Sequence, residues 1–199
     1  MTITYEDGTG LYINSTNRCT NNCDFCVRTT EDGYYGNLWL EREPTVEEMI
    51  ADIDKRDLAK YTEVVFCGYG EPTERIDDMI EVARRVKAVH PMKIRVNTNG
   101  HARLLHPGKD VTSIFEGAID IVSISLNTAN AADYQKVSHS RFGEAAYDAL
   151  IKFAGDVRPY VSEVLLSVVR GSIPDEDIEI CRTIADKVGV TLRVRDLIK

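Results

Sequence analysis

Short runs rich in β-branched residues alternate with amphipathic segments along almost all of this 199-residue chain. Runs of this kind, bounded by turn-forming residues, are typical of strands, and the amphipathic segments between them are typical of crossover helices. The sequence predicts six strands, over residues 11–16, 63–68, 93–98, 119–126, 163–169 and 190–194. This alternation favours α/β architectures over all other classes.

The segments between the strands carry helix signals. Thr-Val-Glu-Glu follows Pro44 and forms a capping-box pattern at the start of segment 45–61. Segment 73–89 follows Pro72 and places its apolar residues on one stripe. Further helices are predicted near 143–155 and 175–188, with short helical turns at 111–115 and 129–137.

Alternating strands and helices imply a mainly parallel sheet with right-handed crossovers, either doubly wound or curled toward a barrel. The chain has six such units in 199 residues, whereas a closed eight-unit barrel typically takes roughly 250 residues. No repeat, linker or low-complexity tract divides the sequence. We therefore predict one domain over residues 1–199, an α/β fold in the form of an incomplete (β/α)6 TIM-type barrel with parallel strands.

Composition and charge narrow the possible partners. With 43% hydrophobic and 28% charged residues, the chain has the composition of a globular protein, not of a disordered or coiled-coil one. The net charge of −8 argues against nucleic acid or anionic lipid as a general partner. No apolar run approaches the roughly 18 residues that span a bilayer, and the start of the sequence has no leader pattern. We expect a cytoplasmic protein without a membrane partner.

Three of the five cysteines crowd into eight residues after the first predicted strand. Cys19, Cys23 and Cys26 have the spacing C-x3-C-x2-C, and an odd cysteine count without an export signal favours metal ligation over disulfides. A structural zinc site would need a fourth ligand, such as Cys67 or a histidine. Three thiolates on a four-iron cluster instead leave one iron open to an exogenous ligand. We interpret Cys67 and Cys181 as small buried hydrophobic residues.

The cysteine spacing, with Phe25 before the third cysteine, resembles the hallmark of the radical S-adenosylmethionine (SAM) superfamily. The resemblance extends over nearly the whole chain, through the segments Gly68-Tyr-Gly-Glu-Pro72, Asn97-Thr-Asn-Gly100, Ser125-Leu-Asn127 and Val168-Val-Arg-Gly171. The overall pattern is most similar to small members, the glycyl-radical activating enzymes and the radical SAM proteins associated with TatD-type hydrolases.

The resemblance implies an enzyme in which Cys19, Cys23 and Cys26 bind a [4Fe–4S] cluster. In the family, SAM chelates the open iron, and an electron from the reduced cluster cleaves SAM to methionine and a 5′-deoxyadenosyl radical. That radical abstracts a hydrogen atom from the substrate, while the protein orients and shields the cofactors. The resemblance also implies an electron donor such as flavodoxin or ferredoxin.

The same resemblance assigns SAM-binding roles to the other motifs. Gly68 and Gly70 would let the backbone approach the methionyl amine, because glycine has no Cβ. Tyr69 stands where the family usually has its first glycine, and Glu71 completes the motif. Hydrogen bonds to the ribose and the methionyl carboxylate are expected from Asn97, Thr98, Ser125 and Asn127. Contacts to the adenine are expected from Phe25, Val168 and Val169.

The substrate stays open at this point. Because six strands do not close a barrel and no extension follows Lys199, we expect either a macromolecular substrate that completes the wall or a small one enclosed by a dimer partner. Two alternatives to this reaction remain. One is radical SAM modification of RNA or a nucleoside, and the other is a zinc-binding interaction module without catalysis.

Basic residues gather near the predicted ends of three strands. Those near the last two strands could clamp a carboxylate or phosphate, or form surface salt bridges, and they are Arg170, Arg193 and Arg195. Those after the third strand are interpreted as a solvated surface loop, in preference to a site for an anionic substrate or an electron donor, and they are His101, Arg103, His106 and Lys109.

Overall fold

The computed structural model describes residues 1–29 and 36–196, and these form one sheet whose strands stand in sequence order. The strands are β1 (Thr4–Asp7), β2 (Gly10–Ile13), β3 (Glu63–Phe66), β4 (Lys93–Thr98), β5 (Ile121–Ser125), β6 (Glu163–Arg170) and β7 (Thr191–Asp196). β1 pairs antiparallel with β2, and every other neighbouring pair is parallel. Since β1 and β7 do not pair in this described part, the barrel is open.

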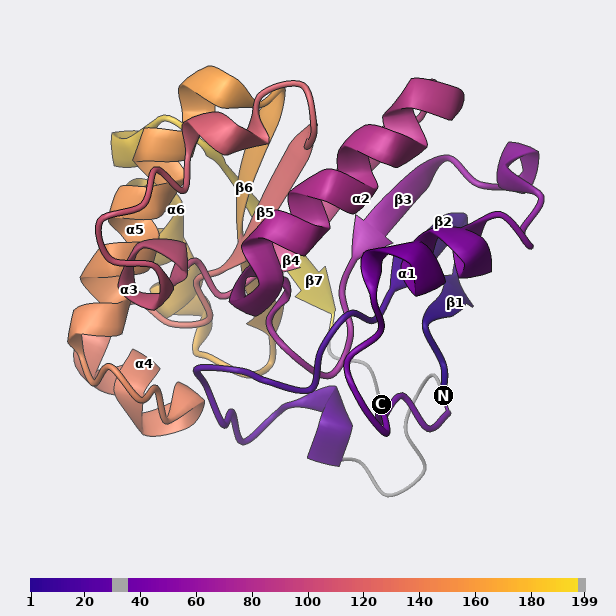
Figure 1. Ribbon diagram of the computed structural model, residues 1–199. Coiled ribbons are helices and arrows are strands. Elements are labelled where there is room, and N and C mark those ends of the chain that lie inside the picture. Colours follow the sequence, from indigo (N-terminus) through magenta and orange to yellow (C-terminus); the bar gives the residue numbers. More distant parts are fainter. Residues whose placement is uncertain (30–35, 197–199) are drawn as a thin grey trace.

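Helices alternate with the strands as predicted, and Figure 1 shows them around the outside of the curved sheet. The α-helices are α1 (Val46–Ile53), α2 (Ile76–Val89), α3 (Ala102–Leu105), α4 (Ala131–Ser138), α5 (Ala145–Val157) and α6 (Asp175–Val188). The 3-10 helices are η1 (Val27–Thr29), η2 (Leu58–Lys60), η3 (Pro72–Arg75), η4 (Ser113–Phe115) and η5 (Arg158–Tyr160). Thr45 and Glu48 form the predicted capping box at the start of α1.

The incomplete α/β barrel is confirmed, with one strand more than predicted. β1 was missed because its four residues, Thr-Tyr-Glu-Asp, include one β-branched residue and end in two acidic ones. Thr4 is held from outside the sheet, since its hydroxyl donates to Asp52 at 2.7 Å. None of the described helices is both long enough and apolar enough to cross a membrane.

The two faces of the sheet differ in chemistry because side chains alternate along each strand. On the outer face, one apolar core joins the sheet to the helices, and its members include Phe66, Val96, Val122 and Leu166, all fully buried. The inner face is mostly polar toward the carboxyl ends of the strands, with Arg95, Asn97, Ser123, Ser125 and Ser167. The apolar core that stabilises the fold therefore lies on the outer face of the sheet, and the polar groups lie on the inner face.

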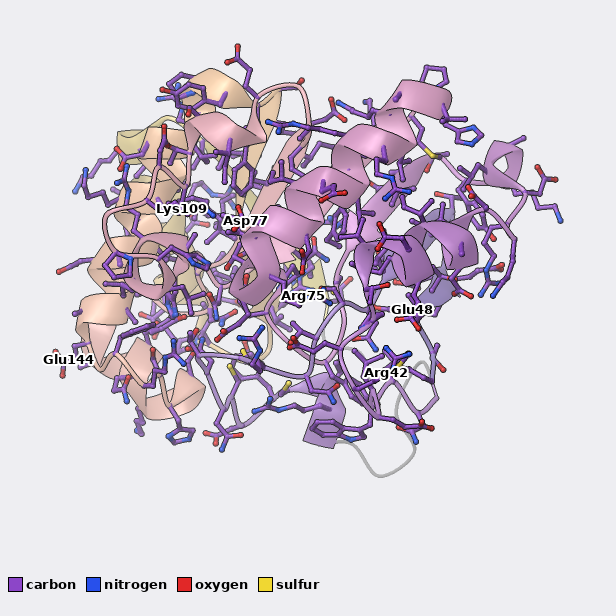
Figure 2. All side chains as sticks on the ribbon, viewed as in Figure 1. Arg42, Glu48, Arg75, Asp77, Lys109 and Glu144 are labelled. Carbon is purple, nitrogen blue, oxygen red and sulfur yellow. The ribbon has the colours of Figure 1, made fainter. Side chains whose placement is uncertain are left out.

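Arg75, labelled in Figure 2, ties the chain after β2 to the helices. Its guanidinium donates to the carbonyl oxygen of Ser15 at 2.9 Å and to that of Pro44 at 2.6 Å. The same group pairs with Asp78 on α2 at 2.5 Å. Because these carbonyls flank the cysteine loop, Arg75 fixes where that loop leaves the sheet and where the chain returns to α1.

Candidate active site

A cavity of roughly 220 Å³ lies at the carboxyl ends of the parallel strands, the edge at which barrel enzymes carry their chemistry. Residues from the loop after β2 and from the ends of β3, β4, β5, β6 and β7 line it. The predicted site residues in its wall are Cys19, Cys23, Phe25, Cys26, Gly68, Gly70, Glu71, Asn97, Thr98, Ser125 and Asn127. The fold thus brings together motifs that are more than 100 residues apart in the sequence.

The thiols of the cysteine loop are held where they ionise poorly by themselves. Burial raises the pKa of the Cys19 thiol to about 12, and the nearby Glu71 carboxylate acts in the same direction. Burial also raises the pKa of the Cys23 thiol, while the Ser138 hydroxyl acts against it. A bound metal supplies the positive charge that turns such thiols into thiolates. Ionisation of the two thiols would therefore depend on positive charge from a bound group.

The cysteine loop supplies three thiols to the cavity, one fewer than the four ligands of a structural zinc site. Within residues 1–29 and 36–196, no three His, Cys, Asp or Glu side chains converge closely enough to hold one metal ion. A structural zinc ion needs four ligands around one centre, whereas a four-iron cluster binds each thiolate through a separate iron. The buried Asn21 Oδ1 and Ser138 Oγ atoms lack an ordinary hydrogen-bond partner in this described part, and both residues act on the Cys23 thiol.

Gly68 and Gly70 lie against the end of β2 and the cysteine loop, with no space for a side chain. A Cβ on Gly68 would come within 2.1 Å of Asn14 Oδ1. A Cβ on Gly70 would come within 2.3 Å of the Thr16 carbonyl oxygen and 2.6 Å of that of Arg18. The two glycines are therefore required for packing one motif against the other. Their predicted contact with the methionyl amine stays a prediction.

The Tyr69 side chain, between these glycines, lies outside the cavity. It packs with Tyr5 and Leu38 in a small apolar cluster separate from the main core. Its ring meets that of Trp39 edge to face, with centroids 5.2 Å apart, and its hydroxyl donates to the Gly36 carbonyl at 3.1 Å. A tyrosine in place of the usual glycine therefore leaves the cavity unobstructed.

The Glu71 carboxylate joins the ends of β3 and β4. It accepts hydrogen bonds from the Thr98 hydroxyl at 2.6 Å, the Asn99 N–H at 2.7 Å, and the Thr73 hydroxyl and N–H at 2.7 and 3.0 Å. Burial raises the pKa of Glu71, and these donors act in the opposite direction. All four donors belong to the chain itself, so Glu71 shapes the cavity by holding its loops.

The other predicted polar residues are positioned in several ways. Asn97 Oδ1 accepts a hydrogen bond from Arg95 at 2.9 Å, and the Thr98 hydroxyl is engaged by the carboxylate just described. Asn127 has a left-handed backbone conformation, with φ of 63°, which asparagine tolerates better than most residues. Ser125 lies beside it at the end of β5. Their roles toward SAM stay predictions.

Asn99 is a site residue that the sequence analysis did not single out. Its side-chain amide donates to the Thr20 hydroxyl at 2.6 Å and to the Cys19 sulfur at 3.8 Å. The available signal was its position, directly after β4 and within the Asn-Thr-Asn-Gly segment. Asn99 links the third motif to the first cysteine.

His101 continues this network into the interior, where it is fully buried. Its Nδ1 lies 2.9 Å from the Thr20 hydroxyl oxygen, and its Nε2 lies 3.2 Å from the Tyr134 hydroxyl oxygen. The Tyr134 hydroxyl in turn accepts from the Asn21 amide at 2.9 Å. Burial lowers the pKa of His101 to about 4, so the imidazole is neutral near pH 7.

The prediction of a solvated basic loop after the third strand is thus wrong for His101. Of its other members, Arg103 pairs with Asp156 at 2.7 Å, and Lys109 pairs with Asp77 on α2, as Figure 2 shows. These ion pairs lie among the helices and outside the cavity lining. The loop is bound into the fold because each strand end must connect back to a packed helix.

Strand alternation decides which side chains of β6 and β3 reach the cavity. The Val168 side chain is fully buried in the core on the outer face, and Val169 is half-buried outside the cavity lining. β6 presents Ser167 to the cavity instead. Cys67, interpreted as a buried core residue, lies partly exposed in the cavity wall, whereas Cys181 is buried as predicted. A backbone contact from Val168 or Val169 to the adenine stays a prediction.

Comparison with known proteins decides the family. A family model described as the radical SAM superfamily matches residues 13–186, which is most of the chain. The chain belongs to the radical SAM superfamily. Members of this family are enzymes that use a [4Fe–4S] cluster and SAM, so the chemistry expected from the cysteine loop and the strand motifs is that of the family.

Individual relatives match about half of the chain or more, at 30% identity or less. A protein of Phocaeicola vulgatus described as a probable dual-specificity RNA methyltransferase RlmN is 30% identical over 100 residues, which are 48% of this chain and 27% of that protein. Streptococcus suis SuiB bound to its precursor peptide SuiA has a TM-score of 0.67 at 16% identity, over 96% of this chain and 39% of that one.

A radical SAM methyltransferase from Sphaerobacter thermophilus has a TM-score of 0.64 at 19% identity, and the match covers 96% of this chain and 56% of that one. The chain therefore spans less than two thirds of each of these proteins. At these identities, the structural likenesses show a shared fold.

Proposed function

We propose that this chain reductively cleaves SAM at a [4Fe–4S] cluster, and that the resulting 5′-deoxyadenosyl radical abstracts a hydrogen atom from a substrate not yet identified. One observation carries the proposal. Three thiols, two packed glycines and the polar ends of β4 and β5 share one cavity at the carboxyl edge of the sheet. Family membership supports the same chemistry.

Cys19, Cys23 and Cys26 are the residues that would hold the cluster. When bound, a [4Fe–4S] cluster supplies the electron for SAM cleavage and an open iron that SAM can occupy. Asn99 donates to the Cys19 sulfur and orients it. The Ser138 hydroxyl and Asn21 favour the ionised form of Cys23, against the effect of burial.

The ends of the neighbouring strands would bind SAM. Gly68 and Gly70 bring the backbone after β3 to the cavity without side-chain obstruction. Asn97, Ser125 and Asn127 supply amide and hydroxyl groups that suit ribose hydroxyls and a carboxylate. With Thr98 engaged by Glu71, its hydroxyl mainly serves to hold the wall.

The nature of the substrate is a further part of the proposal. The open barrel suits a macromolecular substrate, and two similar proteins are described with such partners, RNA for RlmN and a precursor peptide for SuiB. Of these two classes we favour a protein or peptide, since the net charge of −8 argues against general attraction to RNA. We also propose a flavodoxin or ferredoxin as electron donor.

Anaerobic reconstitution with iron and sulfide, followed by dithionite reduction in the presence of SAM, tests the reaction. We expect a protein that binds four irons and forms 5′-deoxyadenosine, detected by chromatography. Cys23→Ala should abolish both properties. Cys181→Ala is the matched control, because Cys181 is buried in the core and not in the cavity wall. It should retain the cluster and the product.

The opposite result is equally clear. A protein that holds one zinc ion, takes up no cluster and leaves SAM intact contradicts the proposal and supports the zinc-binding interaction module. If 5′-deoxyadenosine forms but accumulates faster with added RNA than with any small molecule or peptide, the reaction stands and the RNA alternative replaces the open substrate.

A further inference from the structure

The last strand of the sheet brings two arginines to the cavity. Arg193 and Arg195 stand two residues apart on β7, so they share one face of the sheet, and both line the cavity. Arg193 is in register with Ser167 on β6, which is in register with Ser125 on β5. A row of two hydroxyl groups therefore leads from a predicted SAM-binding residue to Arg193.

The charged side chains of the neighbouring strands at this edge have partners within the chain. Arg95 is buried in the cavity wall, and its guanidinium makes two hydrogen bonds to Glu63, at 2.7 and 3.0 Å. The Glu71 carboxylate accepts the four hydrogen bonds described above. Arg170, at the end of β6 but outside the cavity, pairs with Asp196 at 3.7 Å.

Arg193 differs from these residues. Its side chain is exposed, and in the part of the chain that the structure describes no carboxylate or carbonyl engages its guanidinium. The positive charge of the neighbouring Arg195 acts on Cys67, which lies in the wall of the same cavity. Burial raises the pKa of the Cys67 thiol, and the charge of Arg195 acts against that rise. Since the chain as a whole carries a charge of −8, this positive wall is a local feature.

We propose that Arg193, beside the positive charge of Arg195, binds an oxyanion of the substrate, a carboxylate or a phosphate group. A guanidinium presents paired N–H donors in one plane, which matches two oxygens of either anion. The Ser167 hydroxyl lies in register beside Arg193 and can add a third donor. The inference rests on the proposed function for the reaction that follows binding, but the anion site is tested without it.

The position in the sheet favours the substrate over SAM as the source of the oxyanion. The cysteine loop follows β2 and the glycine motif follows β3, whereas β7 forms the far edge of the sheet. Three strands, at about 4.8 Å each, lie between β3 and β7. The arginines thus face the cysteine loop across the cavity, at the open side of the barrel.

Isothermal titration calorimetry of the reconstituted protein tests the site, with inorganic phosphate and with malonate as separate probes at constant ionic strength. We expect one equivalent to bind, and Arg193→Gln to weaken binding by about tenfold or more. Arg193→Lys keeps the charge but loses the paired donors, so it should give an intermediate affinity. Tighter binding of phosphate or of malonate tells which oxyanion the site prefers.

Arg170→Gln is the matched control, because it removes the same charge from the neighbouring strand outside the cavity. Its affinity for phosphate and for malonate should stay within about twofold of that of the wild type, since salt largely screens an exposed charge outside the site. If Arg193→Gln binds phosphate and malonate as tightly as the wild type does, the proposal is wrong.

Titrations with saturating SAM separate the two sources of the oxyanion. If Arg193→Gln weakens SAM binding about tenfold and SAM blocks the phosphate site, the arginines bind the methionyl carboxylate and the proposal is wrong. Formation of 5′-deoxyadenosine is assayed separately. If none forms while phosphate still binds through Arg193, the proposed function fails and the anion site stands.

Discussion

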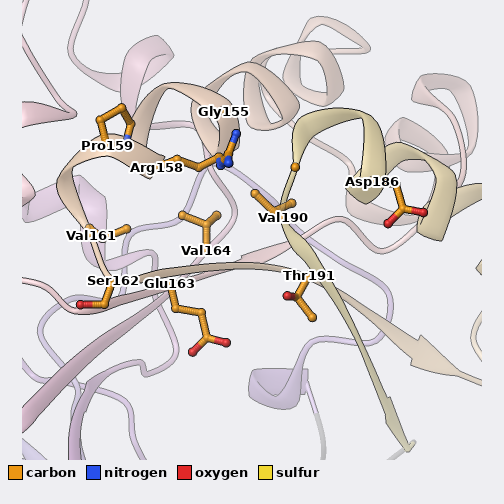
Figure 3. A pocket seen from close by; sticks show the side chains of 11 residues that line it. Gly155, Arg158, Pro159, Val161, Ser162, Glu163, Val164, Asp186, Val190 and Thr191 are labelled. Atoms are coloured by element: carbon orange, nitrogen blue, oxygen red, sulfur yellow. The ribbon is translucent and has the colours of Figure 1, made fainter.

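The two ends of the sheet carry hollows that differ in size and in chemistry. The hollow at the amino ends of β6 and β7, shown in Figure 3, measures roughly 730 Å³, against roughly 220 Å³ for the cavity at the carboxyl ends. Its charged side chains are Arg158, Glu163 and Asp186, and its described lining includes no cysteine or histidine. The smaller cavity is lined by every cysteine of the loop and by the ends of five strands. Volume alone is therefore a poor guide to the site.

The difference has a topological cause. The amino-end hollow is lined by two connections, from α5 to β6 and from α6 to β7, so few chain segments contribute polar groups. At the carboxyl edge, the ends of parallel strands from distant parts of the sequence meet. In barrels, the carboxyl edge serves chemistry and the amino edge serves stability. Equivalent substitutions at the two edges should therefore have different effects.

Glycine-to-alanine substitutions give the largest expected contrast. Gly70→Ala places a Cβ within 2.3 Å of the Thr16 carbonyl oxygen, and backbone there cannot move aside. We expect the free energy of unfolding to fall by about 3 kcal/mol, with loss of cluster retention. Gly155→Ala, in α5 beside the amino-end hollow, meets only Val188 Cγ1 at 3.7 Å. Because it replaces a helical glycine, it should stabilise the protein by about 0.5 kcal/mol.

Urea unfolding of both variants under anaerobic conditions measures this contrast. Equal stability of Gly70→Ala and Gly155→Ala would show that the loop after β3 is not locked against the cysteine loop. An unstable Gly155→Ala would instead show that the amino-end hollow is packed more tightly than its open lining implies.

Glutamate-to-glutamine substitutions at the two edges give a smaller contrast. In Glu71→Gln, one donor among Thr73, Thr98 and Asn99 would face the new NH2 group in place of an oxygen. A buried donor left without an acceptor costs about 2 kcal/mol. Glu163→Gln changes an exposed side chain at the amino edge, so it should leave the midpoint of urea unfolding unchanged. A wild-type midpoint for Glu71→Gln would contradict the network.

The sequence predicted some features of the fold and of the candidate site and not others. The alternation of strands and helices predicted the barrel, because six parallel strands need buried, β-branched runs and amphipathic crossovers. β1 was not predicted because it is short and half-exposed, and because its pairing with β2 depends on the turn between them. The loops that carry the motifs were predicted from their resemblance to those of the radical SAM superfamily, and for the cysteines also from their spacing.

The face of each strand was harder to assign than its position. A register error of one residue exchanges core and cavity: the Val168 side chain lies in the core, and Ser167, which the sequence analysis did not single out, lines the cavity. Cys67 was misjudged for the same reason. The network of Asn99, Thr20 and His101 could not be predicted, since it depends on contacts between loops that only the folded sheet brings together.

Histidines at the two edges give the smallest expected contrast, through pH. Burial and the charge of Arg141 lower the pKa of His101 to about 4 in the folded chain, whereas an unfolded histidine has a pKa of about 6.5. Below pH 6.5 unfolding therefore takes up a proton, so acid favours the unfolded state. Between pH 7 and 5.5 the free energy of unfolding should fall by about 1 kcal/mol through this residue.

Urea unfolding at several pH values tests this prediction. His101→Gln should remove this residue's part of the slope of the free energy of unfolding against pH, although it lowers stability at every pH by disturbing Thr20 and Tyr134. His90→Gln, at the half-exposed end of α2 on the amino edge, is the control for replacing a histidine outside this network. If both variants keep the wild-type slope, His101 is solvated, and the carboxyl edge is more open to water than its hydrogen bonds indicate.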